Sequence, residues 1–476
     1  MGFWSRLLGR IKQMLFFLNS GNEIEKAFGV RLVTSPEMDS AMLRWDTVSS
    51  GKPPWLDSED DIETVNMAKH IADFRAKLTS LDIGITVSGS ARADYLQDIA
   101  SQLLTRLPDS LCEADRLGGM MIKWNGKSWD FVMPGNFGVT DMDNNKHVTG
   151  AIFAAHTVQG SSYFTRLEYH RFEKTGSGEE EGRLYRISNK CFKNRVSAGN
   201  ITSLGDEVKL TSVTEWQHIQ PETYIRNLEH PLFAYYRVPG VNIIDTASPF
   251  GMSVFANAMT ELKAIDIGIS RKNAEVEDSR HITFVGQQLV KNAQGKGIKL
   301  PRFVKGLGIG LNDTETSSIH EHTPTMLTEE RIKDINFNLS MAGVKCGFSA
   351  GVFVLDGKTG MITATQVEAD DRDTIQTIKT DRDALKTAIE QAFYGADAMA
   401  SLYGAAPIGS YELNFSFGDI TYNYEEDKAS WKYYVAQGWV PKWLFLVKFE
   451  GMAEEEAKAL VAEAEPKQNT LFALEE

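Results

Sequence analysis

The chain has 476 residues, with 50 basic and 64 acidic side chains and a formal net charge of −14 at pH 7. At roughly 150 residues per domain, this length suits about three structural units and excludes a single small binding module. The negative charge excludes a polycation that coats nucleic acid, so any contact with DNA must be local or weak. A hydrophobic content of 42% and a charged content of 24% indicate a globular protein, not a coiled-coil or disordered chain.

The amino-terminal segment, MGFWSRLLGRIKQMLFFL, has Arg6, Arg10 and Lys12 among apolar residues at helical spacing. Its apolar face would consist of Trp4, Leu7, Leu8, Ile11, Leu15 and Leu18. The charges interrupt the apolar run, which falls short of the about 20 residues that cross a bilayer. The pattern therefore predicts an amphipathic helix and no membrane span. It favours docking on a partner or on the chain's own domain, and a helix on a membrane surface is the alternative.

Two helices and a sheet are predicted next. Residues 59–82 have apolar side chains at helical spacing after a run of acids, and a second helix is expected over residues 91–107. From residue 118 to residue 216 the chain consists of short alternating runs separated by turn formers, such as Asn125 and Gly126. This pattern predicts a mainly antiparallel sheet, with a hairpin turn at that Asn-Gly pair.

The middle of the chain returns to helical spacing. Helices are expected over residues 250–278 and 328–344, on either side of a glycine-rich block of short strands at residues 281–325. Within this block, His320-Glu321-His322 is interpreted as a solvated polar loop, not as a pair of metal ligands.

The last third of the chain is predicted to begin with a flexible stretch over residues 347–360. Residues 363–403 contain no proline and one glycine, so they are expected to form one long helix. One strand at ELNFSF and two short helices should follow within residues 411–476. Together these expectations define an α+β protein.

Acidic residues cluster in the predicted long helix, and they suggest the one enzymatic alternative, a metal-dependent hydrolase. The cluster alternates with Arg372, Lys379 and Arg382, as a solvated helix face does. No nucleophile elbow, zinc motif or phosphate loop is present in the sequence. We therefore predict no catalytic residue, no metal and no cofactor. The acids in question are Asp370, Asp371, Asp373, Asp381 and Asp383.

Several ordered segments resemble the portal proteins of tailed bacteriophages, particularly those of siphophages of Gram-positive hosts. The likeness extends over nearly the whole chain. The segments are ARADYL (91–96), TGAIFA (149–154), YFTRLEYH (163–170), PLFAYYRVP (231–239), IDTASPFGMSVFANA (244–258), TATQVEADDRDT (363–374) and the tail at 424–459.

The resemblance implies a portal fold with wing, stem, clip and crown regions. A stem consists of paired helices, a clip protrudes from the capsid, and a crown faces its interior. The implied regions are a wing at 1–249, stem helices at 250–278 and 328–345, a clip at 279–327, a tunnel loop at 346–362, a wing spine helix and strand at 363–419, and a crown at 420–476.

The implied function is a non-enzymatic conduit. A ring of subunits, dodecameric in assembled particles, would occupy one capsid vertex and pass double-stranded DNA during packaging and ejection. Its further partners would be the terminase large subunit, the head-tail adaptor, and the major capsid and scaffolding proteins. The implied location is the virion, with assembly in the host cytoplasm.

The resemblance also implies two sets of site residues. The tunnel loop would contain Gly347, Ser349, Gly351, Asp356, Gly357, Lys358 and Gly360. Basic residues of the stem and clip would be candidates for contact with DNA phosphates, although ion pairs between subunits or a solvated face explain such residues equally well. They are Arg271, Lys272, Arg280, Lys296, Lys299, Arg302 and Lys305.

Overall fold

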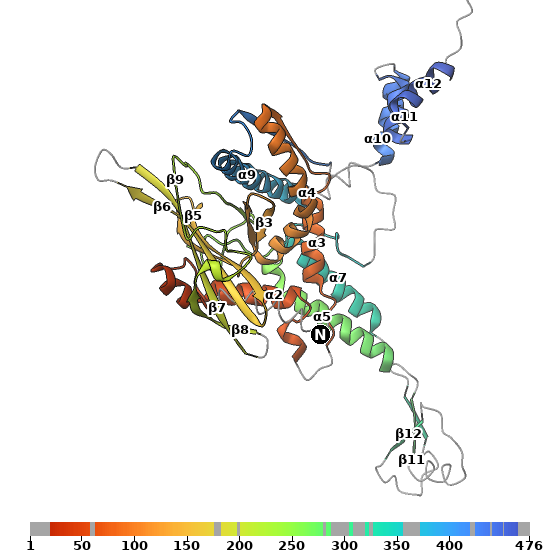
Figure 1. Cartoon of the computed structure of the whole chain (residues 1–476). Helices are drawn as coiled ribbons and strands as arrows, with labels where there is room; N and C mark the ends of the chain where they lie inside the picture. Colours follow the sequence, from red (N-terminus) through yellow and green to blue (C-terminus); the bar gives the residue numbers. More distant parts are fainter. Residues whose placement is uncertain are drawn as a thin grey trace, which may run out of the picture. The chain divides into compact units, whose positions relative to one another are not determined.

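A computed structural model describes residues 20–57, 62–175, 182–197, 200–278, 282–286, 304–307, 319–322, 327–355, 372–418, 424–437, 440–450 and 452–464. The chain divides into two compact units, Met1–Gly418 and Asp419–Glu476. Helices and largely antiparallel sheets occupy separate stretches of the chain, which confirms the α+β prediction (Figure 1). The predicted amino-terminal helix lies outside the described residues, which begin with helical residues 20–28.

Near the amino terminus, α3 (Met67–Thr79) and α4 (Ala91–Leu117) differ from the two predicted helices at their ends. A further helix, α2 (Pro36–Ser49), was not predicted, and a short 3-10 helix, η1 (Pro54–Asp57), lies between α2 and α3. The helix expected from residue 59 begins only at Met67, because Asn66 has a left-handed backbone with φ of 51° and caps it.

Helix α4 continues ten residues past its predicted end, from residue 107 to Leu117, although Pro108 lies inside it. Its buried face continues through Leu111 and Ala114, and this packing outweighs the hydrogen bond that proline cannot make. The helix ends at Gly118, whose φ of 92° suits glycine.

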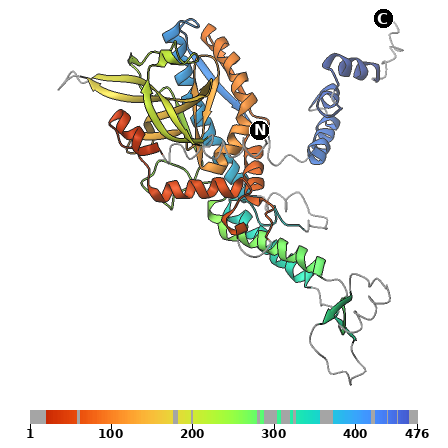
Figure 2. The ribbon, with the colours of Figure 1, turned by 60° about the horizontal axis from the view of Figure 1, so that its bottom comes forward.

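A six-stranded antiparallel sheet forms the largest layer of the first unit (Figure 2). Five strands follow the order β4-β5-β6-β7-β8, and β9 pairs with β7 beyond the end of β8. Helical residues 20–28 cover part of this sheet, since Ile24 packs against Ile152 and Leu167. The strands are β4 (Phe137–Met142), β5 (Val148–Gln159), β6 (Ser162–Thr175), β7 (Gly182–Ser197), β8 (Asn200–Val208) and β9 (Glu222–Arg226); a 3-10 helix, η3 (Leu210–Ser212), follows β8.

A three-stranded antiparallel sheet lies against α4 and α9 (Arg372–Tyr403). Its order is β10 (Ala234–Arg237), β2 (Gly119–Trp124) and β3 (Trp129–Val132). The predicted Asn125-Gly126 hairpin turn is confirmed, because Asn125 N donates to Ser128 O and Gly126 has a φ of 90°. Strand β1 (Gly84–Gly89) pairs with β14 (Tyr411–Ser416), which joins distant parts of the sequence.

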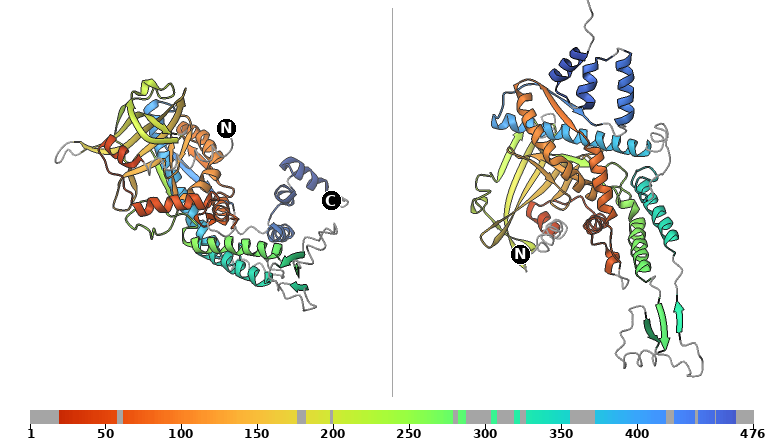
Figure 3. Two further views of the ribbon diagram at one scale, coloured as in Figure 1. Left: turned by 90° about the horizontal axis from the view of Figure 1, so that it is seen from below. Right: turned by 90° about the vertical axis from the view of Figure 1, so that its right-hand side faces the viewer.

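Two antiparallel helices, α5 (Met259–Asp278) and α7 (Thr328–Lys345), run side by side in every view (Figures 1 and 3). The helix expected from residue 250 starts later, after turns and a 3-10 helix, η4 (Ala256–Ala258). The chain between α5 and α7 includes β11 (Ile282–Gly286), β12 (Val304–Leu307) and β13 (Ile319–His322). Because β13 contains the His-Glu-His segment, the predicted loop there is wrong.

The described part of the long helix, α9, begins at Arg372, and residues 363–371 of its predicted range lie outside the described residues. The second unit contains three helices in its described part, where the sequence predicted two. They are α10 (Tyr424–Ala436), α11 (Lys442–Glu450) and α12 (Glu454–Ala464). The pattern missed α11 because its nine residues provide only about two and a half turns of periodicity.

Candidate functional site

The described members of the predicted site lie on α5, in β12 and in the segment that follows α7. Arg271 and Lys272 are consecutive residues of α5, the first exposed and the second half-buried. The backbone of Lys305 lies in β12. Gly347, Ser349 and Gly351 follow directly after α7. The other predicted site residues, Arg280, Lys296, Lys299, Arg302, Asp356, Gly357, Lys358 and Gly360, lie outside the described residues.

Ion pairs at both ends hold α5 against α7. Arg331 Nε lies 2.6 Å from Glu275 Oε2, and Lys345 Nζ lies 2.6 Å from Glu261 Oε1. Between these pairs the helices approach closely, since a Cβ on Gly268 would lie 3.0 Å from Ile335 Cγ1. The two helices therefore form one pair with a defined register.

The predicted flexible stretch is anchored where it begins. Gly347 O accepts a hydrogen bond from Thr377 Oγ1 at 2.7 Å. Ser349 N donates to Thr374 Oγ1 at 2.9 Å, and Thr374 N donates back to Ser349 Oγ at 3.4 Å. Both threonines are in the first two turns of α9, and Ser349 is buried. The expectation of a flexible stretch is therefore corrected for residues 347–349.

Aromatic side chains extend this anchor. The ring centroids of Phe348 and Phe353 are 5.2 Å apart, and both rings contact Phe74 of α3 at 5.6 Å. Gly351 lies between the two phenylalanines with a φ of 93° and open space around it. Packing on both sides thus leaves Gly351 as the exposed turn of the segment.

A buried ion pair holds the end of α7 in place. Arg75 of α3 donates to both carboxylate oxygens of Asp381, at 2.7 and 2.8 Å, and to Cys346 O at 3.1 Å. Burial opposes the charge on Arg75, but the nearby Asp381 outweighs it and raises the pKa of the guanidinium. This bidentate pair links α3, α9 and the first residue after α7.

A second carboxyl, Asp115 of α4, is buried near the same pair. Burial raises the pKa of Asp115 well above its usual 3.8; Arg75 opposes this shift and Asp381 adds to it. Neither its carboxyl oxygens nor the Tyr236 hydroxyl has a hydrogen-bond partner among the described residues. One guanidinium thus stands near two carboxyls, and its two carboxylate hydrogen bonds both go to Asp381.

These contacts correct the solvated-face interpretation of the acidic cluster. Asp381 is buried in its pair with Arg75, and the buried Arg382 donates to Thr79 O, Leu78 O and Gly418 O. Only Asp373 and Asp383 of the described acids are exposed, whereas Asp370 and Asp371 lie outside the described residues. Within the part of the chain that the structure describes, no three His, Cys, Asp or Glu side chains are arranged to hold a metal.

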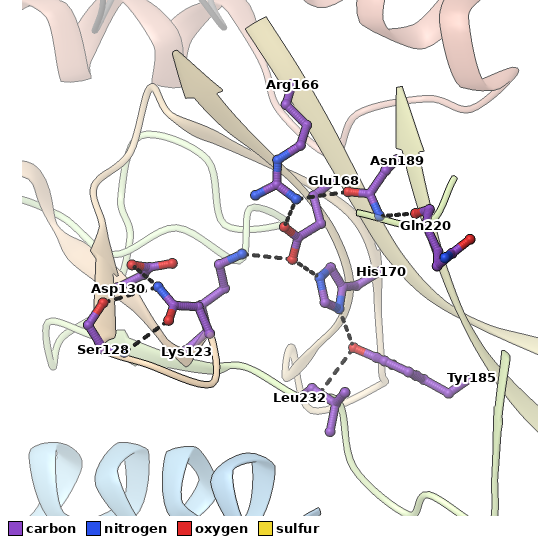
Figure 4. A network of polar contacts seen from close by, with 11 residues as sticks. Lys123, Ser128, Asp130, Arg166, Glu168, His170, Tyr185, Asn189, Gln220 and Leu232 are labelled. Carbon is purple, nitrogen blue, oxygen red and sulfur yellow. Dashed lines mark hydrogen bonds and ion pairs between the residues drawn. The ribbon is translucent and has the colours of Figure 1, made fainter. Parts of the chain in front are cut away.

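A further buried network, which the sequence analysis missed, centres on Glu168 of β6 (Figure 4). Its carboxylate accepts from Lys123 Nζ at 2.7 Å, lies 2.8 Å from Arg166 NH1, and lies 2.6 Å from His170 Nε2. The signal was present in the sequence, because strand alternation places residues 166, 168 and 170 on one face. Charged side chains on one face of a strand that packs against another sheet need buried partners, and this was the sequence feature that could have revealed the network.

Its hydrogen bonds assign the His170 tautomer. Leu232 N donates to the Tyr185 hydroxyl at 3.1 Å, and that hydroxyl lies 2.9 Å from His170 Nδ1. Nδ1 therefore accepts, and Nε2 donates to Glu168. Burial lowers the pKa of His170, and Glu168 offsets this only in part. Since Lys123 belongs to β2 and Glu168 to β6, the network ties the two sheets together.

Comparison with models of known protein families found no match, and comparison with curated proteins found none either. In the described residues, no helix is both long and apolar enough to span a membrane.

Proposed function

We propose that this chain is the subunit of a phage portal, a ring-forming conduit for double-stranded DNA at one capsid vertex. The observation that carries the proposal is the helix pair α5–α7, with short strands between its two helices. An anchored segment and the long helix α9 then follow in the order that the resemblance implies. In this proposal α5 and α7 are the stem, the connecting chain is the clip, and the second unit is the crown.

An apolar stripe on α7 supports assembly into a ring. Phe337 is 64% exposed and Val344 is 48% exposed, and they lie two turns apart on one helix face, with the half-buried Met341 between them. Large apolar side chains grouped on one face favour contact with another protein surface. A ring of identical subunits requires such contacts between two different surfaces of neighbouring copies.

The charge distribution also suits a conduit. A net charge of −14 per subunit opposes tight adhesion to DNA, so a duplex would slide past most of the ring surface. The exposed Arg271 of α5 is then a candidate for a local phosphate contact. The terminase large subunit and the head-tail adaptor would dock on the clip, and the capsid and scaffolding proteins would surround the ring. The chain would act in the virion after assembly in the host cytoplasm.

The test is the mass of the purified full chain by mass photometry, followed by class averages of negatively stained particles. We expect rings of about twelve subunits for the wild type, and loss of rings with unchanged circular dichroism for Phe337→Asp. Tyr224→Asp is the matched control, because this β9 side chain is 53% exposed outside the helix pair. A wild type that stays monomeric with purified scaffolding and capsid proteins would contradict the proposal, and rings that persist in Phe337→Asp would show that the α7 stripe is not a contact between subunits.

No observation among the described residues favours the hydrolase alternative. The most buried acid of the cluster, Asp381, is already paired with Arg75. Its carboxylate would have to leave that guanidinium before it could bind a metal.

A further inference from the structure

A cavity of about 300 Å³ lies between the start of the described chain and the edge of the large sheet. Helical residues 20–28, the segment 30–36, the first turns of α2, and β4 surround it. The segment runs beside β4, since Val33 N donates to Val139 O at 2.7 Å. The volume is at the lower end of the about 300–1,000 Å³ typical of ligand pockets, so it suits a few side chains.

The lining is apolar with an acidic rim. Its large apolar side chains are Leu32, Val33, Met42, Phe137, Val139 and Phe250. Glu25 and Asp39 provide two carboxylates, and none of the described residues that line the cavity is basic. The cavity would thus favour an occupant with apolar side chains and positive charge.

Neither carboxylate has a basic partner among the described residues. Glu25 Oε1 accepts from Leu32 N at 2.8 Å, and Asp39 Oδ1 accepts from Thr34 Oγ1 at 2.6 Å. Burial raises the pKa of Asp39, and the bond from Thr34 offsets this only in part. A cation at the rim would stabilise the ionised form of Asp39.

The chain itself contains a segment with the required chemistry. Residues 1–19 have three basic side chains, Arg6, Arg10 and Lys12, and no acidic one. Their apolar residues have helical spacing, and they join the described chain at Ser20, beside Gly21 and Asn22 of the cavity lining. Lys12 is eight residues from Ser20, a reach of up to roughly 28 Å in an extended chain.

We infer that residues 1–19 of the same chain dock on this cavity. The apolar face that includes Leu15 and Leu18 covers Leu32, Val33 and Phe137, and a basic side chain pairs with Asp39. The connection at the cavity rim keeps the local concentration of the segment high, in the millimolar range for a short tether. The inference does not depend on the proposed ring.

Disulfide trapping in the full chain tests the inference. Leu18→Cys is combined with Val33→Cys in the lining, or with Leu43→Cys as a control, since Leu43 is a 37% exposed residue of α2 outside the lining. Under mild oxidation, we expect at least roughly tenfold more disulfide within one chain for the Val33 pair, because docking would bring residue 18 beside Val33 and not beside Leu43. Equal yields for the two pairs would overturn the inference.

Two alternative occupants give distinct results. A mixture of the single variants Leu18→Cys and Val33→Cys that forms the disulfide between chains, with none within the double variant, would assign the cavity to a second copy and overturn the inference. Binding of wild-type protein to vesicles of anionic phospholipid, with no trapping in either pair, would assign the segment to a membrane surface and overturn it too.

A charge experiment tests the rim without new cysteines near the cavity. Asp39→Asn and Glu37→Gln each neutralise one acid in the first turn of α2, and only Asp39 lines the cavity. Hydrogen exchange of residues 30–36 in the full chain should become severalfold faster in Asp39→Asn and in Leu15→Asp, but not in Glu37→Gln, because only the first two changes release the segment. Unchanged hydrogen exchange in both Asp39→Asn and Leu15→Asp would contradict the inference.

Discussion

At the scale of single residues, the Glu168 carboxylate ties the six-stranded sheet to the sheet of β10, β2 and β3, because it accepts from Lys123 of β2. Replacing it in Glu168→Gln leaves Lys123 and Arg166 largely buried without their anion, so we expect a loss of about 3 kcal/mol in the free energy of unfolding. Urea denaturation measures this. Glu173→Gln on the same strand is the control, and it should cost less than about 1 kcal/mol because its arginine partners are more exposed. Equal losses would contradict the special role of Glu168.

The same network predicts a pH dependence of stability. His170 has a lowered pKa in the folded chain, so below its ordinary 6.5 the unfolded chain binds more protons than the folded one. Its contribution is therefore complete above about pH 6.5 and is lost as the pH falls toward the folded pKa. The pKa of Glu168 lies well below its usual 4.5, so its contribution is lost only at lower pH.

Urea midpoints at pH 7.5, 6.0 and 5.0 check this prediction. The wild type should lose stability from pH 6.5 downward, and His170→Gln should show a smaller loss because glutamine does not titrate. Identical pH profiles for the two proteins would show that His170 is not responsible.

At the scale of elements, the Arg75–Asp381 pair holds the residue that follows α7, because Arg75 also donates to Cys346 O. In Asp381→Asn a largely buried guanidinium loses its anion, so we expect a loss of about 3 kcal/mol in the free energy of unfolding and faster hydrogen exchange at residues 346–349. The exposed Asp383→Asn on the same helix should stay within about 0.5 kcal/mol of the wild type. If both variants matched the wild type, the pair would not anchor this segment.

The elements also show what sequence patterns can and cannot predict. Periodicity located α3, α4, α5, α7 and a sheet between residues 118 and 216, because those signals are local. It did not predict α2 or the strands β1, β9 and β10, which lie outside that range. It misplaced the start of α3 and the end of α4, where a left-handed Asn66 and the packing around Pro108 decide the boundary. Tertiary contacts override local propensity at both places.

The candidate site was less predictable than the fold. Glycine content suggested a flexible stretch after α7, yet Gly347 O bonds to Thr377, a residue 30 positions away. Asp381 looked like part of a solvated face, because no local pattern reveals a partner on α3 that is 306 positions distant. Contacts between residues so far apart depend on the assembled fold and are absent from any local window of sequence.

At the scale of the whole molecule, the boundary after Gly418 separates two compact units. Gly418 is itself fixed to the first unit, since its N donates to Leu81 O at 2.9 Å and its O accepts from Arg382 NH1 at 2.8 Å. Just before it, β14 completes a two-stranded sheet with β1, whose Ile85 and Val87 are buried. The first unit should therefore need the chain as far as Gly418 and no farther.

Two truncations test this expectation. A chain that ends at Gly418 should unfold in urea at the midpoint measured for the first unit in the full chain. A chain that ends at Glu412 loses four of the six residue pairs between β14 and β1, and it exposes Ile85 and Val87. At about 1.5–3 kcal/mol for each buried side chain exposed, it should be several kcal/mol less stable. If the chain ending at Gly418 were equally destabilised, residues 419–476 would contribute to the stability of the first unit, and the two units would unfold as one.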